Sequence, residues 1–473
     1  MATSADLTHT PATELAADLR AKRVSSREIV RAILDRIDEL DGQLQAFVTR
    51  MDDRAMAMAG AADDALARGE DLGIMHGLPV SIKDLLAIEG VRSTQGSLVY
   101  QDSIAMADSP AVARLLREGA VFIGMTNSPE FGMVGWTDNR VFGRTSNPWD
   151  TSRTAGGSSG GAGAAIAAGM GPLAVGTDGG GSIRIPASFC GIFGLKPTWN
   201  LVAKPGSQGG WPTTSHAGPM TRTVADAALM LDAMAGYEPG VAYSYHRPVA
   251  SYSEEIAKPI GRLRIAWSPG MGYATVEPEV VKVAEAAALR FAELGCIVEE
   301  AAPDWSNLAG PLNPFATISS AETLTGLEDL LEVRRDQMMD YTIRVIDAGR
   351  NVTVTDYIRA QQIRAQLWEK LTAFFREYDL LLTPTLAVTA FPHGAPPGRI
   401  AGKEVAPFAW SPFTTPFNLT GAPAASLPVG FDSNELPIGL HLVGPAFQDH
   451  VVLRAAAAYE EAFPWASQRP PLR

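Results

Sequence analysis

The stretch from residue 156 to residue 184 constrains the fold of this chain more than any other. Eleven of its 29 residues are glycine, and a glycine inside a helix or strand costs about 0.5–1 kcal/mol relative to alanine. This density predicts sharp turns and close backbone approaches. Two glycine clusters each present a serine, Ser158 in Gly-Gly-Ser-Ser-Gly-Gly and Ser182 in Asp-Gly-Gly-Gly-Ser-Ile-Arg. The small, apolar residues 162–170 between them predict a buried helix.

The glycine clusters match known motifs only in part. A phosphate-binding loop requires a lysine directly after its last glycine, which neither cluster has, and the spacing does not fit a dinucleotide fingerprint. Residues 156–160 satisfy the G-x-S-x-G pattern of a nucleophile elbow, but such an elbow follows a strand. The preceding residues 146–154 predict turns instead. The alternative to a functional site is a glycine-rich loop that serves only packing, in which the two serines have no catalytic role.

A lysine that precedes the clusters in sequence favours a functional site over a packing loop. The short apolar run Val80–Ile82 follows Pro79 and predicts a strand buried on both faces, with Lys83 at its end. The alternative for this lysine is a surface position paired with Asp84.

Together these residues resemble the Ser–cis-Ser–Lys triad of the amidase signature family. Ser182 lies 24 residues after Ser158, and Lys83 lies 75 residues before Ser158. The resemblance covers most of the chain and includes the segments Thr126–Gly132, Asn147–Trp149, Gly194–Thr198, Gly218–Val224, Asp379–Pro384 and Leu436–Leu440.

The resemblance implies an amide-bond hydrolase that works through an acyl-enzyme. Ser182 would attack the substrate carbonyl, Ser158 would relay its proton, and neutral Lys83 would accept it, since burial lowers the pKa of a lysine. It also implies a cis peptide between Gly157 and Ser158.

The glycines before the nucleophile have a physical role in such a reaction. Backbone amides at Gly179, Gly180 and Gly181 can converge on an oxyanion only where no Cβ intervenes. Residues 125–154 form a long irregular connection with several aromatic residues, which favours an ordered pocket wall. We expect the substrate-binding residues to include Gly132, Met133, Trp136 and Thr177. Trp211 adds to the expectation of a moderately hydrophobic substrate.

Three further charged or polar residues are expected to have structural roles. Asp178 and Arg184 flank Ser182 and predict an ion pair that braces the turn. His441 stands where the family usually has glutamine, and we expect a hydrogen-bonded structural histidine.

Composition narrows the class of protein. The chain has 473 residues and a net charge of −13, which argues against non-specific nucleic-acid binding. Only two cysteines are present, Cys190 and Cys296, so a reducing, cytoplasmic location without disulfides is expected. No signal peptide or uninterrupted apolar span of 18 residues is visible, so no membrane association is expected. The seven histidines show no metal-binding spacing, and we expect neither metal nor cofactor.

Strands and helices alternate along the chain, which predicts an α/β fold. We expect a central mixed, mostly parallel twisted sheet covered by helices on both faces. The absence of repeats and clear linkers favours a single domain over residues 1–473. Within it we distinguish N-terminal helices (1–70), a signature core (71–225), a peripheral lobe (226–330) and a C-terminal part of the core (331–473).

The substrate stays open at this stage. Arg364 resembles the arginine with which the A subunit of glutamyl/aspartyl-tRNA amidotransferases binds the carboxylate of glutamine. However, Ser411 stands where that protein has an acidic residue, and Met125 and Pro129 also depart from its pattern. These differences favour a stand-alone hydrolase for a small amide, anilide, carbamate or ester. Two alternative functions stay open, the amidotransferase subunit and a non-catalytic binding protein on the same fold. Assembly into a homodimer also stays open.

Overall fold

One large sheet organises the molecule. A computed structural model describes residues 7–70, 73–204, 212–305 and 312–472, and its main sheet has eleven strands in the order β1-β3-β2-β6-β8-β7-β14-β15-β11-β9-β10. The strands are β1 (Phe47–Arg50), β2 (Pro79–Lys83), β3 (Val121–Thr126), β6 (Leu173–Asp178), β7 (Phe193–Lys196), β8 (His216–Thr221), β9 (Arg264–Trp267), β10 (Ile297–Glu300), β11 (Leu380–Pro384), β14 (Ala424–Phe431) and β15 (Pro437–Val443).

The expected mixed α/β sheet is confirmed, but its parallel pairs are confined to two blocks. Strands β3, β2 and β6 pair in parallel, as do β11, β9 and β10. The pairs from β6 through β8, β7, β14 and β15 to β11 are antiparallel, and β1 is antiparallel to β3. The expectation of mostly parallel pairing therefore holds for these blocks and not for the middle of the sheet.

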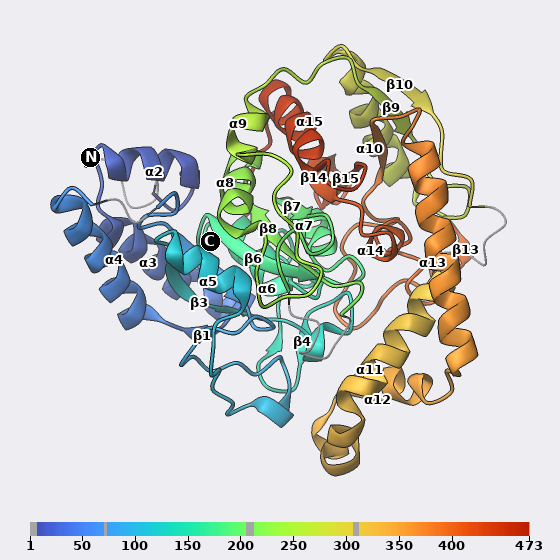
Figure 1. The fold of residues 1–473 in the computed structure, drawn as a ribbon, viewed down its shortest axis with the longest axis horizontal. Coiled ribbons are helices and arrows are strands. Elements are labelled where there is room, and N and C mark those ends of the chain that lie inside the picture. The colour runs from blue at the N-terminus through green and yellow to red at the C-terminus, as the bar shows by residue number, and fades with distance from the viewer. Residues whose placement is uncertain (1–6, 71–72, 205–211, 306–311, 473) are drawn as a thin grey trace.

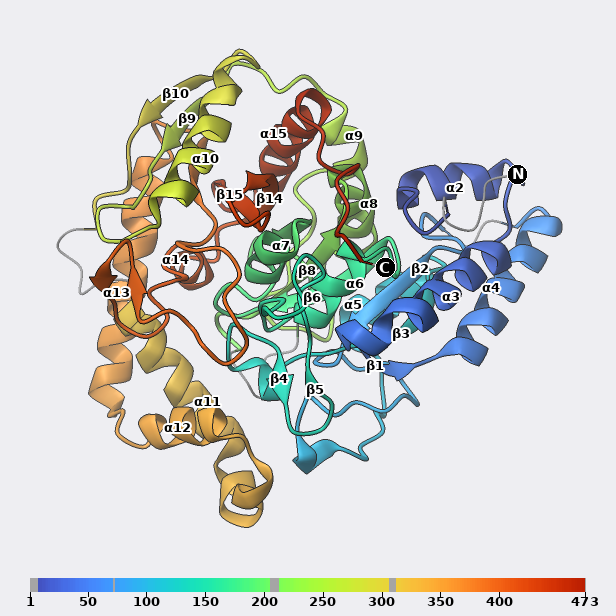
Figure 2. The ribbon, with the colours of Figure 1, turned by 180° about the vertical axis from the view of Figure 1, so that it is seen from behind.

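Helices cover both faces of this sheet. The helices are α2 (Ala12–Arg20), α3 (Ser26–Leu44), α4 (Asp52–Ala67), α5 (Pro110–Arg117), α6 (Gly160–Ala167), α7 (Arg184–Cys190), α8 (Val224–Met234), α9 (Tyr252–Ile256), α10 (Pro278–Leu289), α11 (Leu312–Arg334), α12 (Asp340–Gly349), α13 (Val354–Phe374), α14 (Thr415–Leu419) and α15 (Asp449–Ala462). Helices α6 and α7 pack together against one face, and α8 packs against the other with α9 and α15 (Figure 1 and Figure 2).

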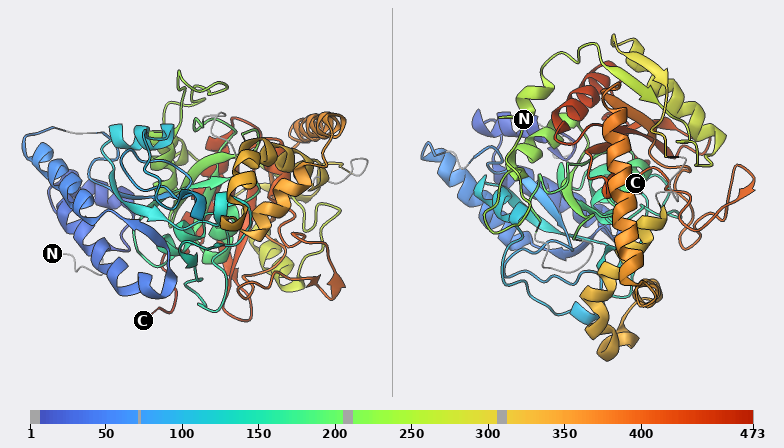
Figure 3. Two further views of the ribbon diagram at one scale, coloured as in Figure 1. Left: turned by 90° about the horizontal axis from the view of Figure 1, so that it is seen from below. Right: turned by 45° about the vertical axis from the view of Figure 1, so that its right-hand side comes forward.

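Local sequence explains several helix starts. Ser25 caps α3 and forms a capping box with Glu28, as its sequence predicts. Thr353 and Asp356 form a second capping box at α13. Helices α11, α12 and α13 pack on one another at one side of the molecule (Figure 3). Residues 320–377 are therefore mostly helical.

A β-α-β unit follows residue 263 and joins the main sheet. Strands β9 and β10 flank α10 in sequence, pair in parallel and form one edge of the sheet. One small ribbon, β4 (Asp138–Asn139) with β5 (Gly143–Arg144), lies in the long connection predicted over residues 125–154. A second, β12 (Arg399–Ile400) with β13 (Lys403–Glu404), lies between β11 and α14.

The register of the parallel block positions the site. Val80 pairs with Leu173 and Ile82 with Val175, so β2 and β6 run side by side in the same direction. Their carboxyl ends, Lys83 and Asp178, therefore meet at the same edge of the sheet. The second glycine cluster follows β6 at this edge, and a hydrogen bond from the amide of Ser159 to the carbonyl of Ser182 holds the first cluster beside it.

Candidate active site

Lys83 is buried at the end of a strand, as its sequence predicts. All five residues of β2 are buried, and no part of Lys83 is exposed. Its Nζ lies 2.7 Å from Ser158 Oγ and donates to Thr177 Oγ1 at 3.0 Å and to the Thr177 carbonyl at 3.4 Å. Burial lowers the pKa of Lys83 well below its usual value, although the charge of Asp178 works in the opposite direction.

The alternative pairing of Lys83 with Asp84 is wrong. The carboxylate of Asp84 accepts hydrogen bonds from the amide and the hydroxyl of Thr94 instead. Burial raises the pKa of Asp84 to about 6. Strand β2 ends at Lys83 and the chain turns at Asp84, so the two neighbouring side chains have different partners.

Ser158 lies in the first glycine cluster, directly ahead of α6. The peptide between Gly157 and Ser158 is cis, as the family resemblance implies. A Cβ on Gly157 would lie 2.7–2.8 Å from backbone atoms of Trp136, so only glycine fits at this position. No strand precedes Ser158 within residues 146–157, which excludes the nucleophile elbow.

Ser182 lies in the second glycine cluster, between β6 and α7. Its exposed fraction is 6%, and its carbonyl accepts a hydrogen bond from the amide of Ser159 at 3.1 Å, which ties the two clusters together. Its hydroxyl donates to no residue in the described ranges.

The carboxylate of Asp178 holds the second cluster in place. It accepts from the amide of Gly181 at 2.7 Å and from that of Ile183 at 3.1 Å. This corrects the expectation for Gly181, whose amide is already engaged. The amides of Gly179, Gly180 and Ser182 have no acceptor among the described residues.

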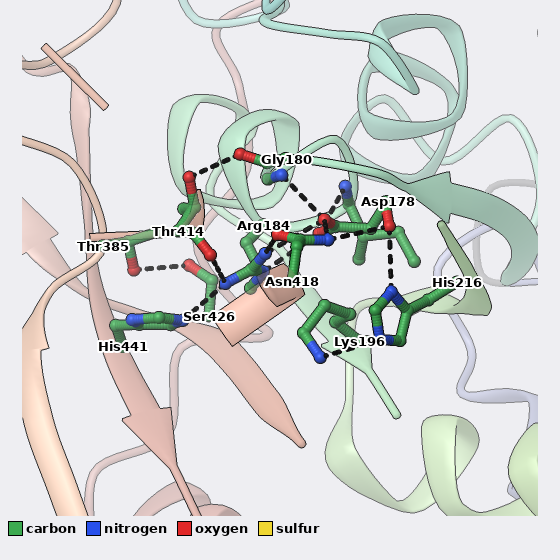
Figure 4. A network of polar contacts seen from close by, with 12 residues as sticks. Asp178, Gly180, Arg184, Lys196, His216, Thr385, Thr414, Asn418, Ser426 and His441 are labelled. Atoms are coloured by element: carbon green, nitrogen blue, oxygen red, sulfur yellow. Dashed lines mark hydrogen bonds and ion pairs between the residues drawn. The ribbon is translucent and has the colours of Figure 1, made fainter. Parts of the chain in front are cut away.

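The predicted ion pair between Asp178 and Arg184 is present and fully buried. Arg184 Nε donates to one carboxylate oxygen of Asp178 and Nη2 to the other, each at 2.9 Å. Although burial alone would raise the pKa of Asp178, the charge and hydrogen bonds of Arg184 hold it far below its usual value. Asn418 donates to the same carboxylate at 2.8 Å (Figure 4). Removal of one partner of such a buried ion pair strongly destabilises a protein, because the other charge stays buried without a countercharge.

His441 is part of this buried network, in line with the structural role expected for it. Its Nε2 accepts from Arg184 at 3.1 Å, and its Nδ1 lies 3.4 Å from Thr383 Oγ1. Burial and the charge of Arg184 lower the pKa of His441 well below its usual value, which keeps the ring neutral. The network also includes Lys196 and His216 (Figure 4).

A cleft of about 440 Å³ opens beside these residues. Ser158, Thr177 and Gly179 line one end of it. Gly132 and Met133 also line it, as expected. A Cβ on Gly132 would lie 3.2 Å from Ser158 Oγ.

Trp136 does not line this cleft. Its ring stacks on Phe408 with centroids 6.0 Å apart, and its backbone packs against Gly157. Trp211 lies outside the described residues. The sequence did not single out Tyr100, Lys204 and Ser215, which line the cleft from segments far from the triad in sequence.

Other features expected from composition can be compared with the structure. Cys190 and Cys296 are both free and buried. In the described ranges no helix is long and apolar enough to cross a membrane. No cluster of three His, Cys, Asp or Glu side chains suited to a metal ion occurs among the residues described.

Comparison with known proteins identifies the family of this chain. The Amidase family model matches residues 28–453. The chain is 39% identical to an acylamidase of Rhodococcus erythropolis over 467 residues, which are 97% of this chain and 96% of that protein. It is 37% identical to the A subunit of the glutamyl-tRNA(Gln) amidotransferase of Moorella thermoacetica over 488 residues, 99% of each chain. The crystal structure of a bacterial aryl acylamidase superposes with a TM-score of 0.91 at 30% identity and covers 97% of both chains.

The chain therefore belongs to the amidase family. It is an amidohydrolase that acts on C–N bonds.

Proposed function

We propose that this protein is a stand-alone serine amidase that hydrolyses small or moderately hydrophobic amides. The observation that carries this proposal is the buried 2.7 Å contact between Lys83 Nζ and Ser158 Oγ. Ser158 lines the cleft, and the hydrogen bond from the amide of Ser159 to the carbonyl of Ser182 ties the turn of Ser182 to this pair. A buried lysine with a lowered pKa is a suitable base. An activated hydroxyl next to such a base is the arrangement that nucleophilic catalysis requires.

The hydrogen bonds of Lys83 fit a neutral amine. A neutral lysine has two N–H donors and one lone pair. If the donors bind the hydroxyl and the carbonyl oxygen of Thr177, the lone pair is left for the hydroxyl of Ser158, which then donates to Nζ. Thr177 would thus orient the base.

The chemical steps follow from this orientation. Ser182 Oγ attacks the carbonyl carbon while its proton passes to Ser158 Oγ, whose own proton passes to Lys83 Nζ. The tetrahedral intermediate collapses, the proton returns through Ser158 to the leaving nitrogen, and an amine leaves. Water then attacks the acyl-enzyme by the same proton path and releases the carboxylic acid.

The second glycine cluster would stabilise the oxyanion. We assign this role to the amides of Gly179, Gly180 and Ser182, because that of Gly181 donates to Asp178. Removal of one oxyanion donor typically costs about 3 kcal/mol of transition-state stabilisation. The anchored Gly181 would keep the other amides in a fixed orientation.

Two residues support a hydrolase over a glutamine-using subunit. The guanidinium of Arg364 donates to the carbonyls of Leu419 at 2.6 Å and Thr213 at 2.7 Å, which engages two of its donors internally. Ser411 is buried and lies 3.0 Å from the hydroxyl of Thr414, and a serine there supplies no carboxylate for the amino group of glutamine. The subunit function stays the second candidate because of the 37% identity with such a protein.

A substrate panel tests this proposal. Purified protein is incubated with acetanilide, hexanamide, a phenyl carbamate, a phenyl ester and glutamine, with Ser182→Ala as the control. We expect hydrolysis of the amides, with carbamates and esters as further substrates, and none in the control. Release of glutamate alone would support the subunit function, and no turnover of any compound would support a non-catalytic role.

We also propose cytoplasmic activity as a single domain without a metal or cofactor. The two free, buried cysteines support a reducing compartment. Strands from both halves of the chain in one sheet support a single domain. Activity that is lost on treatment with EDTA and restored by metal would contradict the metal-free reaction.

A further inference from the structure

A second lysine lines the cleft. Lys204 is half-buried, and its Nζ donates to Ser215 Oγ at 2.7 Å. It forms no ion pair with a carboxylate in the part of the chain that the structure describes. Burial lowers the pKa of Lys204 to about 8, although the charge of Glu322 works in the opposite direction. At pH 7 most molecules therefore carry an ammonium group here.

This ammonium gives the cleft its formal charge. The other described residues that line the cleft have uncharged side chains. The polar ones among them include Ser93, Gln95, Tyr100 and Ser103. None of the described residues that line the cleft carries a carboxylate. A cleft with one sign of charge and low-dielectric walls concentrates the opposite charge.

The ammonium also lies on the side of the proposed oxyanion donors. Strands β6 and β8 are antiparallel, and Asp178 pairs with His216. Gly179 directly follows Asp178, and Ser215, the partner of Lys204, directly precedes His216, and both line the cleft. A group held by Lys204 would therefore belong to a part of the substrate close to the reacting carbonyl.

We propose that Lys204 is a specificity-determining residue that makes this cleft prefer amides carrying a carboxylate over neutral and cationic amides. The proposal rests on the amidase function proposed above and names its substrate class. Ser215 takes one of the three ammonium donors, which leaves two for a carboxylate. Charge-assisted hydrogen bonds of this kind are about twice as strong as neutral ones. A cationic substrate would meet a like charge instead.

Binding can be measured without turnover. The probes are N-phenylsuccinamic acid, its methyl ester and N-phenyl-4-aminobutanamide, and calorimetric titration at pH 7 uses Ser182→Ala protein. We expect the acid to bind at least about tenfold tighter than the ester and the amine to bind weakest. Adding Lys204→Met should reduce the preference for the acid by about tenfold, whereas Lys204→Arg should retain it because arginine keeps the charge.

The pH dependence gives a second readout that needs no substitution. The probe carboxylate stays ionised between pH 6 and pH 10, so its preference over the ester should decrease as the pH rises through the pKa of Lys204. The charged group that acts on Lys204 is Glu322. Lys83, which burial keeps neutral, is the nearby titratable group whose pKa the charge of Lys204 lowers in turn. Taking the ratio of acid to ester binding cancels changes that affect both probes alike.

Three results would overturn the inference: equal binding of acid and ester, a preference that survives Lys204→Met, or no binding of either probe. Failure of the amidase function itself would be visible separately. In that case wild-type protein would hydrolyse none of the three probes, whichever of them binds.

Discussion

Substitution of Gly132 by alanine should damage catalysis more than it damages folding. The new Cβ would lie 3.2 Å from Ser158 Oγ and 2.8 Å from Leu85 Cδ1. The leucine can rotate its flexible end away, but Ser158 must shift by a few tenths of an ångström from its 2.7 Å contact with Lys83. We expect kcat/KM to decrease about 10- to 100-fold, which corresponds to about 1.4–2.7 kcal/mol in the activation barrier.

Backbone strain must be separated from this contact. Gly132 has φ of +72°, where a residue with a Cβ costs about 1–2 kcal/mol. Gly394 is the matched control, because its φ is +71° and a Cβ there would have no atom within 4 Å. Both alanine variants should lose similar thermal stability, but only Gly132→Ala should lose most of its activity toward an anilide. Equal activity losses in the two variants, or none in Gly132→Ala, would refute the reasoning.

Three further predictions follow from the charged groups. Lys83→Arg should be nearly as inactive as Lys83→Ala, about 100-fold or more below wild type in kcat/KM, since arginine cannot give up its proton; substantial rescue by arginine would remove Lys83 as the base. Wild-type kcat/KM should fall as the pH drops through the lowered pKa of Lys83. Lys204→Met should move this acidic limb to higher pH, because the charge of Lys204 contributes to that lowering, and an unchanged pH profile would contradict this coupling. Asp178→Asn should destabilise the fold by about 3–5 kcal/mol in denaturant unfolding, because it leaves the buried guanidinium of Arg184 without a countercharge; a loss below about 1 kcal/mol would contradict this account.

The fold class could be predicted because the strands and helices near the site have strong local patterns. The strand that ends at Lys83 and the capped helix after Ser25 are examples. Strand β8 is not predicted by its sequence because it contains Gly218 and Pro219, which are unfavourable within a strand. Pro219 nevertheless pairs with Val175, so tertiary packing overrides local preference at this position.

The catalytic candidates could be predicted from motifs, whereas much of the cleft could not. Lys83, Ser158 and Ser182 stand in distinctive glycine-rich or strand-end contexts. Lys204 stands in no such motif and lines the cleft from the connection between β7 and β8, where it donates to Ser215. Tertiary structure brings it there, which explains why no sequence pattern indicates its charge at the cleft. The engagement of the Gly181 amide by Asp178 depends on the detailed conformation of a turn, and residue types alone do not specify it.

Covalent labelling tests the central claim, that Ser182 is the nucleophile, most directly. A fluorophosphonate reacts with activated serines, and peptide mapping by mass spectrometry locates the adduct. We predict one adduct on Ser182 in wild-type protein, slow labelling in Ser158→Ala and Lys83→Ala, and none in Ser182→Ala. An adduct on Ser158, or undiminished labelling of Ser182→Ala, would contradict the assignment of the nucleophile.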